Sequence, residues 1–257
     1  INAPESCLVP SGERHVKAVV CEAWGSPNSL QVKDMPLPVP GPGQVRVRVR
    51  VAAVNFPDAL MVAGKYQFRP EFPFPPGAEF SGEVSAIGEG VLTPAVGDKV
   101  IGTAAFGAYA EEVLADAAQV VVLPADTDDD ELELAGSFLL TYGTSYHALK
   151  DRADAKPGET LLVLGAGGGV GLAAVELGKR MELRVIAAAS SEAKREAARS
   201  RGADEVLDYT AEDFRDRLKA LTGGRGVDIV YDPVGGDIAE TALRSVGWRG
   251  RYLVVGF

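Results

Sequence analysis

Five glycines within seven residues, "GAGGGVG" at 165–171, separate two segments of opposite character. The residues before them, "TLLVL" at 160–164, form a continuous apolar run that is typical of a buried strand. The residues after them, "VGLAAVELGKRM" at 170–181, have the apolar spacing of a helix. A strand, a tight glycine turn and a helix form the first unit of a parallel sheet, so this stretch restricts the possible folds more than any other.

The same alternation of strand and helix continues to the end of the chain. A helix is expected over 133–153, before the glycine turn. Further strands are expected at 183–189, 205–209, 227–235 and 250–257, and further helices at 191–202, 211–224 and 237–247. Repeated strand and helix units predict an α/β class domain with a doubly wound parallel sheet over residues 137–257.

The first half of the chain has a different texture, with many valines, prolines and glycines. The stretch "QVRVRVRVAAV" at 44–54 alternates strictly between valine and arginine, which predicts a half-solvated antiparallel strand. Shorter strand patterns follow at 82–90, 96–104 and 108–124, and the last is expected to supply edge strands. We therefore expect an open barrel or sandwich over residues 15–136, after an arm at 1–14.

Composition excludes several classes of function. The net charge of −10 disfavours broad contact with nucleic acid or an anionic membrane, and no apolar run approaches the length of a membrane span. Both cysteines, Cys7 and Cys21, are too few for a disulfide framework or a four-thiolate zinc site. We expect a protein of a reducing compartment, cytoplasmic or alternatively mitochondrial. The acidic stretch "ADTDDDELE" at 125–133 predicts a solvated helix start.

The glycine turn predicts a dinucleotide site. Ala166, Gly168 and Gly171 fit the Gly-x-Gly-x-x-Gly pattern with alanine in the first place. Such a turn lets the backbone approach a pyrophosphate, which the helix N-terminus then holds through its amides. The alternative is a plain tight turn between strand and helix, but the flanking strand and helix favour the dinucleotide.

The residues after the second strand distinguish between the two nicotinamide cofactors. A cofactor with a bare ribose is usually held by an acidic side chain at this position. This chain has Ser190 and Ser191 there, with Lys194 and Arg195 in the next helical turn, and hydroxyls with cations suit a 2′-phosphate. NADPH is the predicted cofactor. The alternative is that Ser190 or Ser191 only caps the helix and that Lys194 is a solvated helix residue. Glu192 is expected to be a first-turn residue favoured by the helix dipole and not the acid that holds a bare ribose.

Six longer motifs resemble a known family over nearly the whole chain. They are "AAVNFPDALMVAGKY", "PFPPGAEFSGEVSAIGEGV", "VGDKV", "TYGTSYHAL", "PGETLLVLGAGGGVG" and "VDIVYDPVGG". In this order they resemble the medium-chain dehydrogenases/reductases, in the zinc-free quinone oxidoreductase (zeta-crystallin-like) branch. The resemblance implies an N-terminal GroES-like β-barrel catalytic domain, then a Rossmann domain, with the cofactor in the cleft between them.

The resemblance also implies a site without metal. Zinc-dependent relatives have a Cys and a His-Glu pair where this chain has Asn55 and Ala78-Glu79. Neither His15 nor His147 lies in the two segments that contain Asn55 and Ala78-Glu79, and zinc needs about three protein ligands. Without a Lewis acid, the expected chemistry is hydride transfer from NADPH to an electron-poor small molecule, a quinone or a conjugated enone.

By position, the resemblance places Asn55 and Asp58 at the nicotinamide and substrate as catalytic residues; the alternative for both is turn chemistry around Pro57. Many relatives have a tyrosine where this chain has Leu60, and Tyr66 is a substitute to consider. The cofactor-binding residues implied are Thr144, Ala166, Gly168, Gly169, Val170, Gly171, Ser190, Lys194, Tyr209, Gly256 and Phe257.

One apparent motif is rejected. Tyr146 and Lys150 have the spacing of the short-chain dehydrogenase Tyr/Lys pair, but in that family the pair follows the glycine turn, and here it precedes the turn. Tyr146 is expected to pack in a helix, with Lys150 as a solvated helix end. His147 is likewise expected at the surface and not as a base.

Relatives continue for several dozen residues beyond "VVGF", so the chain is expected to be C-terminally truncated, with an incomplete Rossmann domain and impaired turnover. Relatives form homodimers, and the strand that pairs in the dimer is expected to be missing here. Two other functions stay open. One is double-bond reduction of alkenals or enones; the other is a non-catalytic cofactor-binding protein, crystallin-like or RNA-binding, although the acidic charge argues against RNA.

Overall fold

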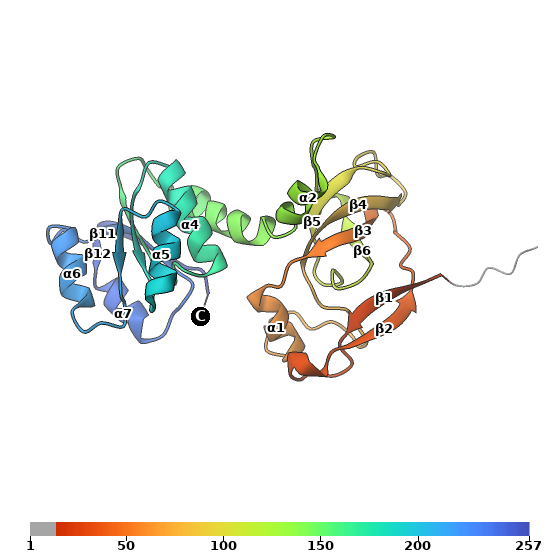
Figure 1. Ribbon diagram of the computed structural model, residues 1–257, viewed down its shortest axis with the longest axis horizontal. Coiled ribbons are helices and arrows are strands. Elements are labelled where there is room, and N and C mark those ends of the chain that lie inside the picture. The colour runs from red at the N-terminus through yellow and green to blue at the C-terminus, as the bar shows by residue number, and fades with distance from the viewer. Residues whose placement is uncertain (1–13, 257) are drawn as a thin grey trace, which may run out of the picture. The chain divides into compact units, whose positions relative to one another are not determined.

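The computed structural model of the chain describes residues 14–256. Contacts divide the chain into an N-terminal unit that ends at Leu139 and a C-terminal unit that begins at Leu140. Each unit has its own sheet and its own apolar clusters, so each has the internal packing of a domain (Figure 1).

The N-terminal unit is built on an antiparallel sheet with the strand order β6-β3-β4-β5-β7. The strands are β3 (Gln44–Ala52), β4 (Glu79–Ile87), β5 (Lys99–Thr103), β6 (Glu112–Asp116) and β7 (Val120–Val122). The alternating stretch forms β3 as predicted, with Val45 and Val47 fully buried. The segment at 108–124, predicted to supply edge strands, forms both edges of this sheet.

The arginine face of β3 is less solvated than the alternation predicts. Arg46 is largely covered, because it lies beside Glu112 and donates hydrogen bonds to the Ser85 hydroxyl and the Pro38 carbonyl. Arg48 and Arg50 keep about half or more of their side-chain surface exposed.

Five elements of this unit have no counterpart among the predictions. The strands β1 (His15–Val20) and β2 (Gln31–Pro36) pair as a separate antiparallel hairpin, with the 3-10 turn η1 (Pro27–Ser29) between them. The helix α1 (Phe56–Val62) begins directly after Asn55, where the sequence allowed a turn. A second 3-10 turn, η2 (Ala117–Gln119), joins β6 to β7.

The acidic stretch forms the start of α2 (Asp129–Ala135), as predicted. The Asp128 carboxylate accepts a hydrogen bond from the amide of Glu131, and the Glu131 carboxylate accepts one from the amide of Asp128. This reciprocal pair is a capping box, which explains why a strongly acidic stretch folds as a helix start.

Aromatic side chains pack together beside helix α1 of the N-terminal unit. The rings of Trp24 and Phe72 have centroids 4.4 Å apart, and Trp24 lies 6.0 Å from the buried Phe74. Met61 and Val62 of α1 pack in the same cluster as Phe74. The helix α1 is therefore held by its apolar face, which fixes the residues at its N-terminus.

The C-terminal unit contains a parallel sheet with the strand order β10-β9-β8-β11-β12. The strands are β8 (Thr160–Val163), β9 (Arg184–Ala188), β10 (Glu205–Leu207), β11 (Val227–Asp232) and β12 (Val246–Val254). In chain order this is third, second, first, fourth, fifth, which is the strand order of a Rossmann sheet. The predicted fold class is confirmed, and the order reverses between β8 and β11, where such folds bind ligands.

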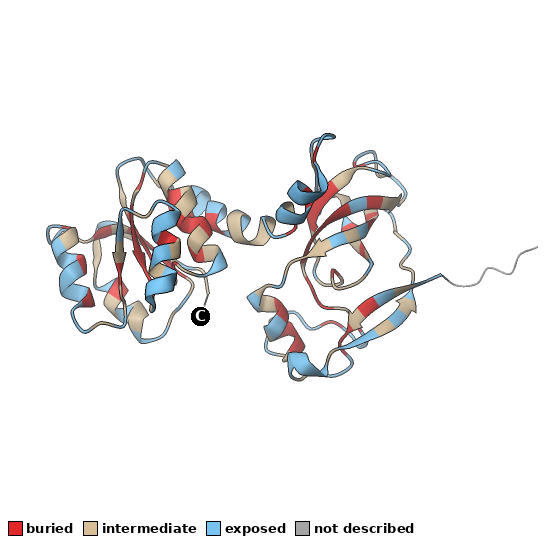
Figure 2. Ribbon diagram, in the orientation of Figure 1, coloured by how far each residue is buried: buried red, intermediate tan, exposed pale blue. Residues whose placement is uncertain are grey.

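Helices cover both faces of this sheet. They are α4 (Gly169–Arg180), α5 (Glu192–Ser200), α6 (Phe214–Leu221) and α7 (Asp237–Leu243), preceded by a helical segment with π-type turns made of η3 (Leu139–Gly143), α3 (Thr144–Tyr146) and η4 (His147–Arg152). Leu161 and Val163 of β8 pack with residues of α4, whereas Leu162 and Leu164 pack with residues of α6. Most residues of β8, β9 and β11 are buried as a result, and buried stretches of this sheet are visible in Figure 2.

The last strand differs from its prediction at both ends. It begins at Val246 and ends at Val254, whereas a strand was expected over 250–257. Val246 pairs with Val227 and Arg251 with Ile229, so the intervening residues bulge out of the ladder. Trp248 in this bulge is 93% exposed. Phe257 lies outside the described residues.

Across residues 14–256, none of the helices combines the length and the apolar character needed to cross a membrane.

Candidate functional site

The glycine turn at the carboxyl end of β8 has the geometry of a phosphate cradle. Gly165 has a φ of 58°, and the helix begins at Gly169 after the N-cap Gly168. A Cβ at position 171 would lie 2.3 Å from the Gly165 carbonyl oxygen and 2.8 Å from the Ala166 Cα. Position 171 therefore requires glycine, and the close approach directs the first helical amides beyond the end of the strand.

Ala166 and Val170 hold the turn in place. Ala166 is fully buried, and its amide donates to the Ala188 carbonyl of β9 at 3.1 Å. Val170, in the first turn of α4, packs against the apolar cluster that includes Leu161. Gly168 and Gly169 are exposed. Ala166 and Val170 thus hold the turn in place, while the backbone at Gly168 and Gly169 stays accessible. A pyrophosphate needs such an accessible backbone to approach the helix N-terminus.

The structure brings Lys194 into contact with the turn. A Cβ at Gly167 would lie 2.4 Å from the Lys194 Cβ and 2.6 Å from its Cγ. The lysine stem therefore covers the turn, while the residue as a whole stays exposed. Among the described residues, Lys194 forms no ion pair, so its ammonium group is available to an anionic ligand.

The two serines lie beside this lysine in sequence. Ser191 is the N-cap residue of α5 and its side chain makes no capping hydrogen bond, while Ser190 is half-buried. The geometry therefore gives no support to the alternative that Ser191 serves to cap the helix through its hydroxyl. Both hydroxyls follow β9 at the same edge of the sheet as the glycine turn.

Arg195 was expected to be a cation for a 2′-phosphate, but its guanidinium is engaged by groups of the protein itself. Its guanidinium donates to the Ala189 carbonyl at 2.9 Å and to the Glu192 carboxylate at 2.9 Å, and it pairs with Asp208 at 2.8 Å. Only 14% of its side chain is exposed. Arg195 thus joins the loops after β9 and β10, and the cation argument for a 2′-phosphate rests on Lys194.

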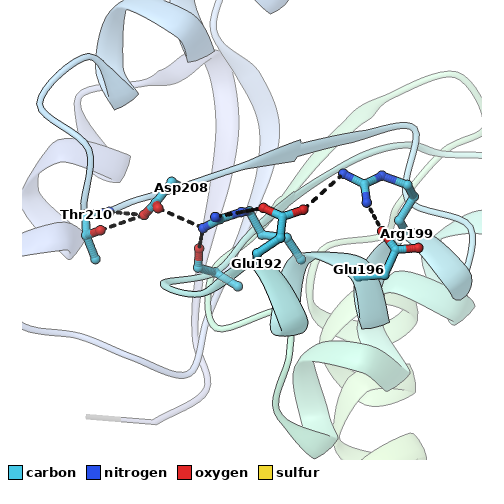
Figure 3. A network of polar contacts seen from close by, with 7 residues as sticks. Glu192, Glu196, Arg199, Asp208 and Thr210 are labelled. Carbon is cyan, nitrogen blue, oxygen red and sulfur yellow. Dashed lines mark hydrogen bonds and ion pairs between the residues drawn. The ribbon is translucent and has the colours of Figure 1, made fainter.

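The same network engages the acidic side chains near the turn (Figure 3). Glu192 also lies near Arg199, which in turn pairs with Glu196. Hydrogen bonds from Thr210, together with the charge of Arg195, hold the pKa of Asp208 below its usual value. Tyr209, the next residue, is half-buried and packs against the cluster that contains Leu207. The carboxylates of Glu192, Glu196 and Asp208 each form an ion pair with an arginine.

Thr144 is exposed on the helical segment before β8, and its neighbour Ser145 is fully buried. The Ser145 hydroxyl lies 2.8 Å from the Thr141 carbonyl, 3.0 Å from the Val170 carbonyl and 2.9 Å from the Tyr231 hydroxyl. Burial raises the pKa of Tyr231 to about 12 against the effect of its hydrogen bond with Ser145, so the phenol stays protonated. Ser145 therefore ties the first turn of α4 to β11. Sequence reasoning missed it, because no pattern separates it from Thr144.

Asp232 fixes the loop at the carboxyl end of β11. One carboxylate oxygen accepts from the amides of Val234 and Gly235 at 2.8 and 2.9 Å, and the other accepts from the Tyr252 hydroxyl at 2.7 Å. Burial and the neighbouring Asp232 raise the pKa of Tyr252 above its usual value. The amide of Gly256 lies 3.3 Å from the Asp232 carbonyl, which places Gly256 at this edge of the sheet.

Replacing Tyr252 with phenylalanine should lower the stability of the C-terminal unit by about 1–3 kcal/mol, because the buried Asp232 oxygen loses its donor. Urea-induced unfolding followed by circular dichroism measures this change. Tyr146→Phe is the matched control, because Tyr146 is 49% exposed, contrary to the packing expected for it. Equal unfolding midpoints for the two variants would show that the Tyr252 hydrogen bond contributes nothing.

In the N-terminal unit, Asn55, Asp58 and Glu79 lie close together. The Asn55 side-chain amide donates to the Glu79 carboxylate at 3.0 Å, and the Asn55 backbone amide donates to the Asp58 carboxylate at 2.8 Å. Asp58 is therefore the third residue of α1 and binds the backbone of its N-cap residue. The alternative that Asn55 and Asp58 only form a turn around Pro57 is wrong, because both residues belong to the start of helix α1.

A phenol completes this group. The Tyr109 hydroxyl donates to Asp58 Oδ2 at 2.8 Å, and burial together with the Asp58 charge raises the pKa of Tyr109 above its usual value. Tyr66, the possible substitute for the tyrosine that relatives have at the position of Leu60, packs with the apolar cluster of Met61 and Phe74. Sequence reasoning missed Tyr109, because it is distant from Asp58 in the chain and follows no local pattern.

Asp58 lies in an unfavourable setting for a charge. It is 3% exposed, and its Oδ1 atom is buried without a hydrogen-bond partner among the described residues. Desolvation raises the pKa of Asp58, and the hydrogen bonds from Asn55 and Tyr109 offset only part of this effect. A hollow of about 660 Å³ borders Asp58 and Tyr109, with Val32, Val49 and Val62 among its apolar lining residues. Buried carboxyls with raised pKa values beside a hollow are typical of groups that hold or move protons.

The residues at this place do not fit a zinc ion. Within residues 14–256, no group of three or more His, Cys, Asp and Glu side chains lies close enough to hold a metal. Asn55 and Glu79 bind each other, and Asp58 is engaged by Tyr109.

Comparison with known proteins decides the family. Residues 41–125 match the alcohol dehydrogenase GroES-like domain, and residues 169–257 match a domain described as zinc-binding dehydrogenase. The mouse quinone oxidoreductase-like protein 2 is 40% identical over 245 residues, which cover 95% of this chain and 69% of that protein. The chain belongs to the medium-chain dehydrogenase/reductase superfamily. This medium-chain dehydrogenase/reductase has quinone oxidoreductase-like relatives, as its motifs predicted.

Solved structures of the superfamily include two complexes with NADPH. A mycobacterial protein in complex with NADPH is 36% identical, with a TM-score of 0.85, and the match covers 94% of this chain and 74% of that one. The Escherichia coli quinone oxidoreductase in complex with NADPH is 32% identical, with a TM-score of 0.85, and the match covers 92% of this chain and 72% of that one. The name of the zinc-binding dehydrogenase domain describes the domain family and places no ligands in this chain.

Proposed function

We propose that this medium-chain dehydrogenase/reductase binds NADPH on its C-terminal unit and reduces a small conjugated carbonyl compound, a quinone or an enone, without zinc. The observation that carries the proposal is the contact between Lys194 and the glycine turn at Gly167. It brings the stem of a lysine that has no ion-pair partner among the described residues against the turn whose helix amides would hold a pyrophosphate. Relatives named quinone oxidoreductases and the two NADPH complexes support it.

When bound, NADPH supplies a hydride to the electron-poor acceptor, and the reduced acceptor then needs a proton. Asn55 can hold a carbonyl oxygen of the acceptor through its side-chain amide, because Glu79 already fixes the orientation of that amide. Tyr109 and Asp58 form a hydrogen-bonded pair whose raised pKa values favour the protonated forms. When Asp58 is protonated, the Tyr109 hydroxyl can give its proton to the reduced acceptor while Asp58 returns a proton to Tyr109. Asp58 then takes up a new proton from water.

Cofactor preference tests the binding half of the proposal. Lys194→Gln should weaken NADPH binding about tenfold and leave NADH binding unchanged, because only NADPH carries the phosphate that a cation stabilises. Calorimetric titration with both cofactors measures the change. Lys150→Gln is the matched control, since Lys150 is exposed on the helical segment before β8. If Lys194→Gln weakened both cofactors equally, the lysine would act on the shared part of the molecule, and the proposed 2′-phosphate contact would be wrong.

The catalytic half is tested separately. The chain is incubated with NADPH and either a benzoquinone or an aliphatic enone, and oxidation of the cofactor is followed by its absorbance. Oxidation that depends on the acceptor supports the proposal, and the ratio of the two rates identifies the preferred acceptor. NADPH binding without oxidation by either acceptor would leave a cofactor-binding protein and overturn the reductase proposal.

A further inference from the structure

A small basic pocket lies at the amino ends of β11 and β12, whereas the glycine turn lies at the carboxyl end of β8. Four cationic side chains line it: Arg215 and Lys219 of α6, Arg225 before β11, and Arg244 before β12. Its volume is about 190 Å³, below the range of about 300–1,000 Å³ that is usual for sites of drug-sized ligands. The pocket lies where β11 and β12 begin, whereas the cofactor residues follow the ends of β8, β9 and β11.

The charge of this pocket is not balanced by the protein. Among the described residues, no aspartate or glutamate lines it. Arg244 pairs with Glu240, but Arg215, Lys219 and Arg225 form no hydrogen bond or ion pair through their side chains with any described residue. This gathering of cations occurs in a chain whose net charge is −10. A concentration of one sign of charge in a concave site raises the local concentration of the opposite ion.

Helix dipoles account for only part of this charge. The helices α6 and α7 end at Leu221 and Leu243, next to the pocket, and cations near a helix C-terminus stabilise it. Each helix end is equivalent to roughly −0.5 of an elementary charge. Two helix ends therefore offset about one of the three unpaired cations, so a clear positive excess is left for a ligand.

The backbone beside the cations is held in one conformation. Gly223, Gly224 and Gly226 all have positive φ angles, between 57° and 80°. A Cβ at Gly226 would lie 2.6 Å from the Gly247 amide nitrogen, so this loop packs directly on the start of β12. The amide of Val227 also donates to the Ser245 carbonyl at 2.9 Å. Arg225 therefore extends from a fixed loop, which lowers the entropy lost when it binds a ligand.

We propose that this pocket binds a phosphate group, as inorganic phosphate or as a small phosphate monoester. Arginine presents a planar fork of donors that matches the oxygens of phosphate, and three unpaired cations match a dianion better than a carboxylate. The volume suits a single phosphate group and not a whole dinucleotide. The site is separate from the cofactor site, so both can be occupied at once, and it does not depend on the proposed reductase activity.

The test is a calorimetric titration of the whole chain with inorganic phosphate at constant ionic strength, in the Lys194→Gln background. That background weakens phosphate binding at the cofactor site. The double variant Arg225→Gln, Lys219→Gln should weaken the remaining binding at least about tenfold, since two charge-assisted contacts are lost. Arg217→Gln is the matched control, because Arg217 is an exposed cation of α6 that does not line the pocket. Circular dichroism checks that each variant is folded.

Each result decides the matter. Binding that is lost in the double variant and kept in Arg217→Gln supports the site. Competition by glycerol phosphate but not by glycerol would extend it to monoesters, and an absence of such competition would restrict it to the free ion. No binding in the Lys194→Gln background would mean that phosphate enters only the cofactor turn, and the proposal would be wrong. Equal weakening by Arg217→Gln would reduce the effect to general charge, which also overturns it.

Discussion

Gly171→Ala is expected to abolish measurable NADPH binding. The added Cβ would lie 2.3 Å from the Gly165 carbonyl oxygen, a distance that real Cβ atoms essentially never show. The nearby Ala166 Cα, at 2.8 Å, is also backbone, so no side-chain rotation relieves the clash. The first turn of α4 must therefore move away from β8, and the amides that face the pyrophosphate lose their common direction. We expect a loss of more than about a hundredfold in affinity.

The measurement is NADPH titration beside urea-induced unfolding. Overpacking of this kind costs typically about 1–3 kcal/mol, so the midpoint should fall while the variant stays folded under native conditions. Gly143→Ala is the matched control, because a Cβ at Gly143 meets nothing within 4 Å and its backbone is helical. That variant should bind NADPH normally. Normal binding by Gly171→Ala would mean that the turn has room to adjust and that the predicted cradle is wrong. If Gly171→Ala were unfolded, the steric clash would be supported but NADPH binding would need another variant. Gly168→Ala would then test the phosphate cradle with less strain, because its Cβ would make only one ordinary contact, at 3.5 Å.

Asp58→Asn should raise stability at neutral pH while it lowers turnover. The folded state raises the pKa of Asp58, so the folded protein binds the proton more tightly than the unfolded chain does. The stability of the N-terminal unit therefore falls as the pH rises from the unfolded pKa of Asp58 through its higher folded pKa, and the loss is complete above that window. Asparagine keeps an acceptor for Asn55 and Tyr109 but carries no charge, so the loss disappears.

The expected signature is a pH-dependent difference between the two proteins. In acid, where the wild-type carboxyl is protonated, their unfolding free energies should agree; above the window Asp58→Asn should be the more stable. Reductase turnover should fall about a hundredfold, since proton transfer by a positioned group contributes at least that much. The exposed Asp126→Asn is the control for both measurements. An Asp58→Asn variant that is less stable than the wild type only at neutral pH would show that the charged carboxylate stabilises the fold, contrary to this account.

The sequence predicted the architecture better than the site, for a physical reason. The strands β8, β9 and β11 were recognisable because their residues are buried on both faces and form continuous apolar runs. The hairpin β1–β2 was missed because only a few of its residues are buried, so its hydrophobic pattern is weak. The helix α1 was missed because a seven-residue helix that starts with Phe-Pro-Asp looks like a turn.

Site residues were predictable where the chemistry is local. The glycine turn and Lys194 follow fixed spacings within one strand and helix unit, so a single sequence was enough to propose them. Arg195 had the right charge, but its ion pair with Asp208 depends on β10 lying beside β9. Tyr109 contacts Asp58 only because the segment before β6 lies beside the start of α1. Such partners are fixed by tertiary packing, which no periodicity reveals.

The bulge in β12 determines how unfolding of this protein can be observed. The chain has two tryptophans, one in each unit, and Trp248 is already 93% exposed in the folded state. Trp24 is 38% exposed and packs against Phe72 and Phe74. Intrinsic fluorescence should therefore change when the N-terminal unit unfolds and stay nearly constant when the C-terminal unit unfolds. A protein in which only the C-terminal unit has unfolded would therefore show nearly the tryptophan fluorescence of the native protein.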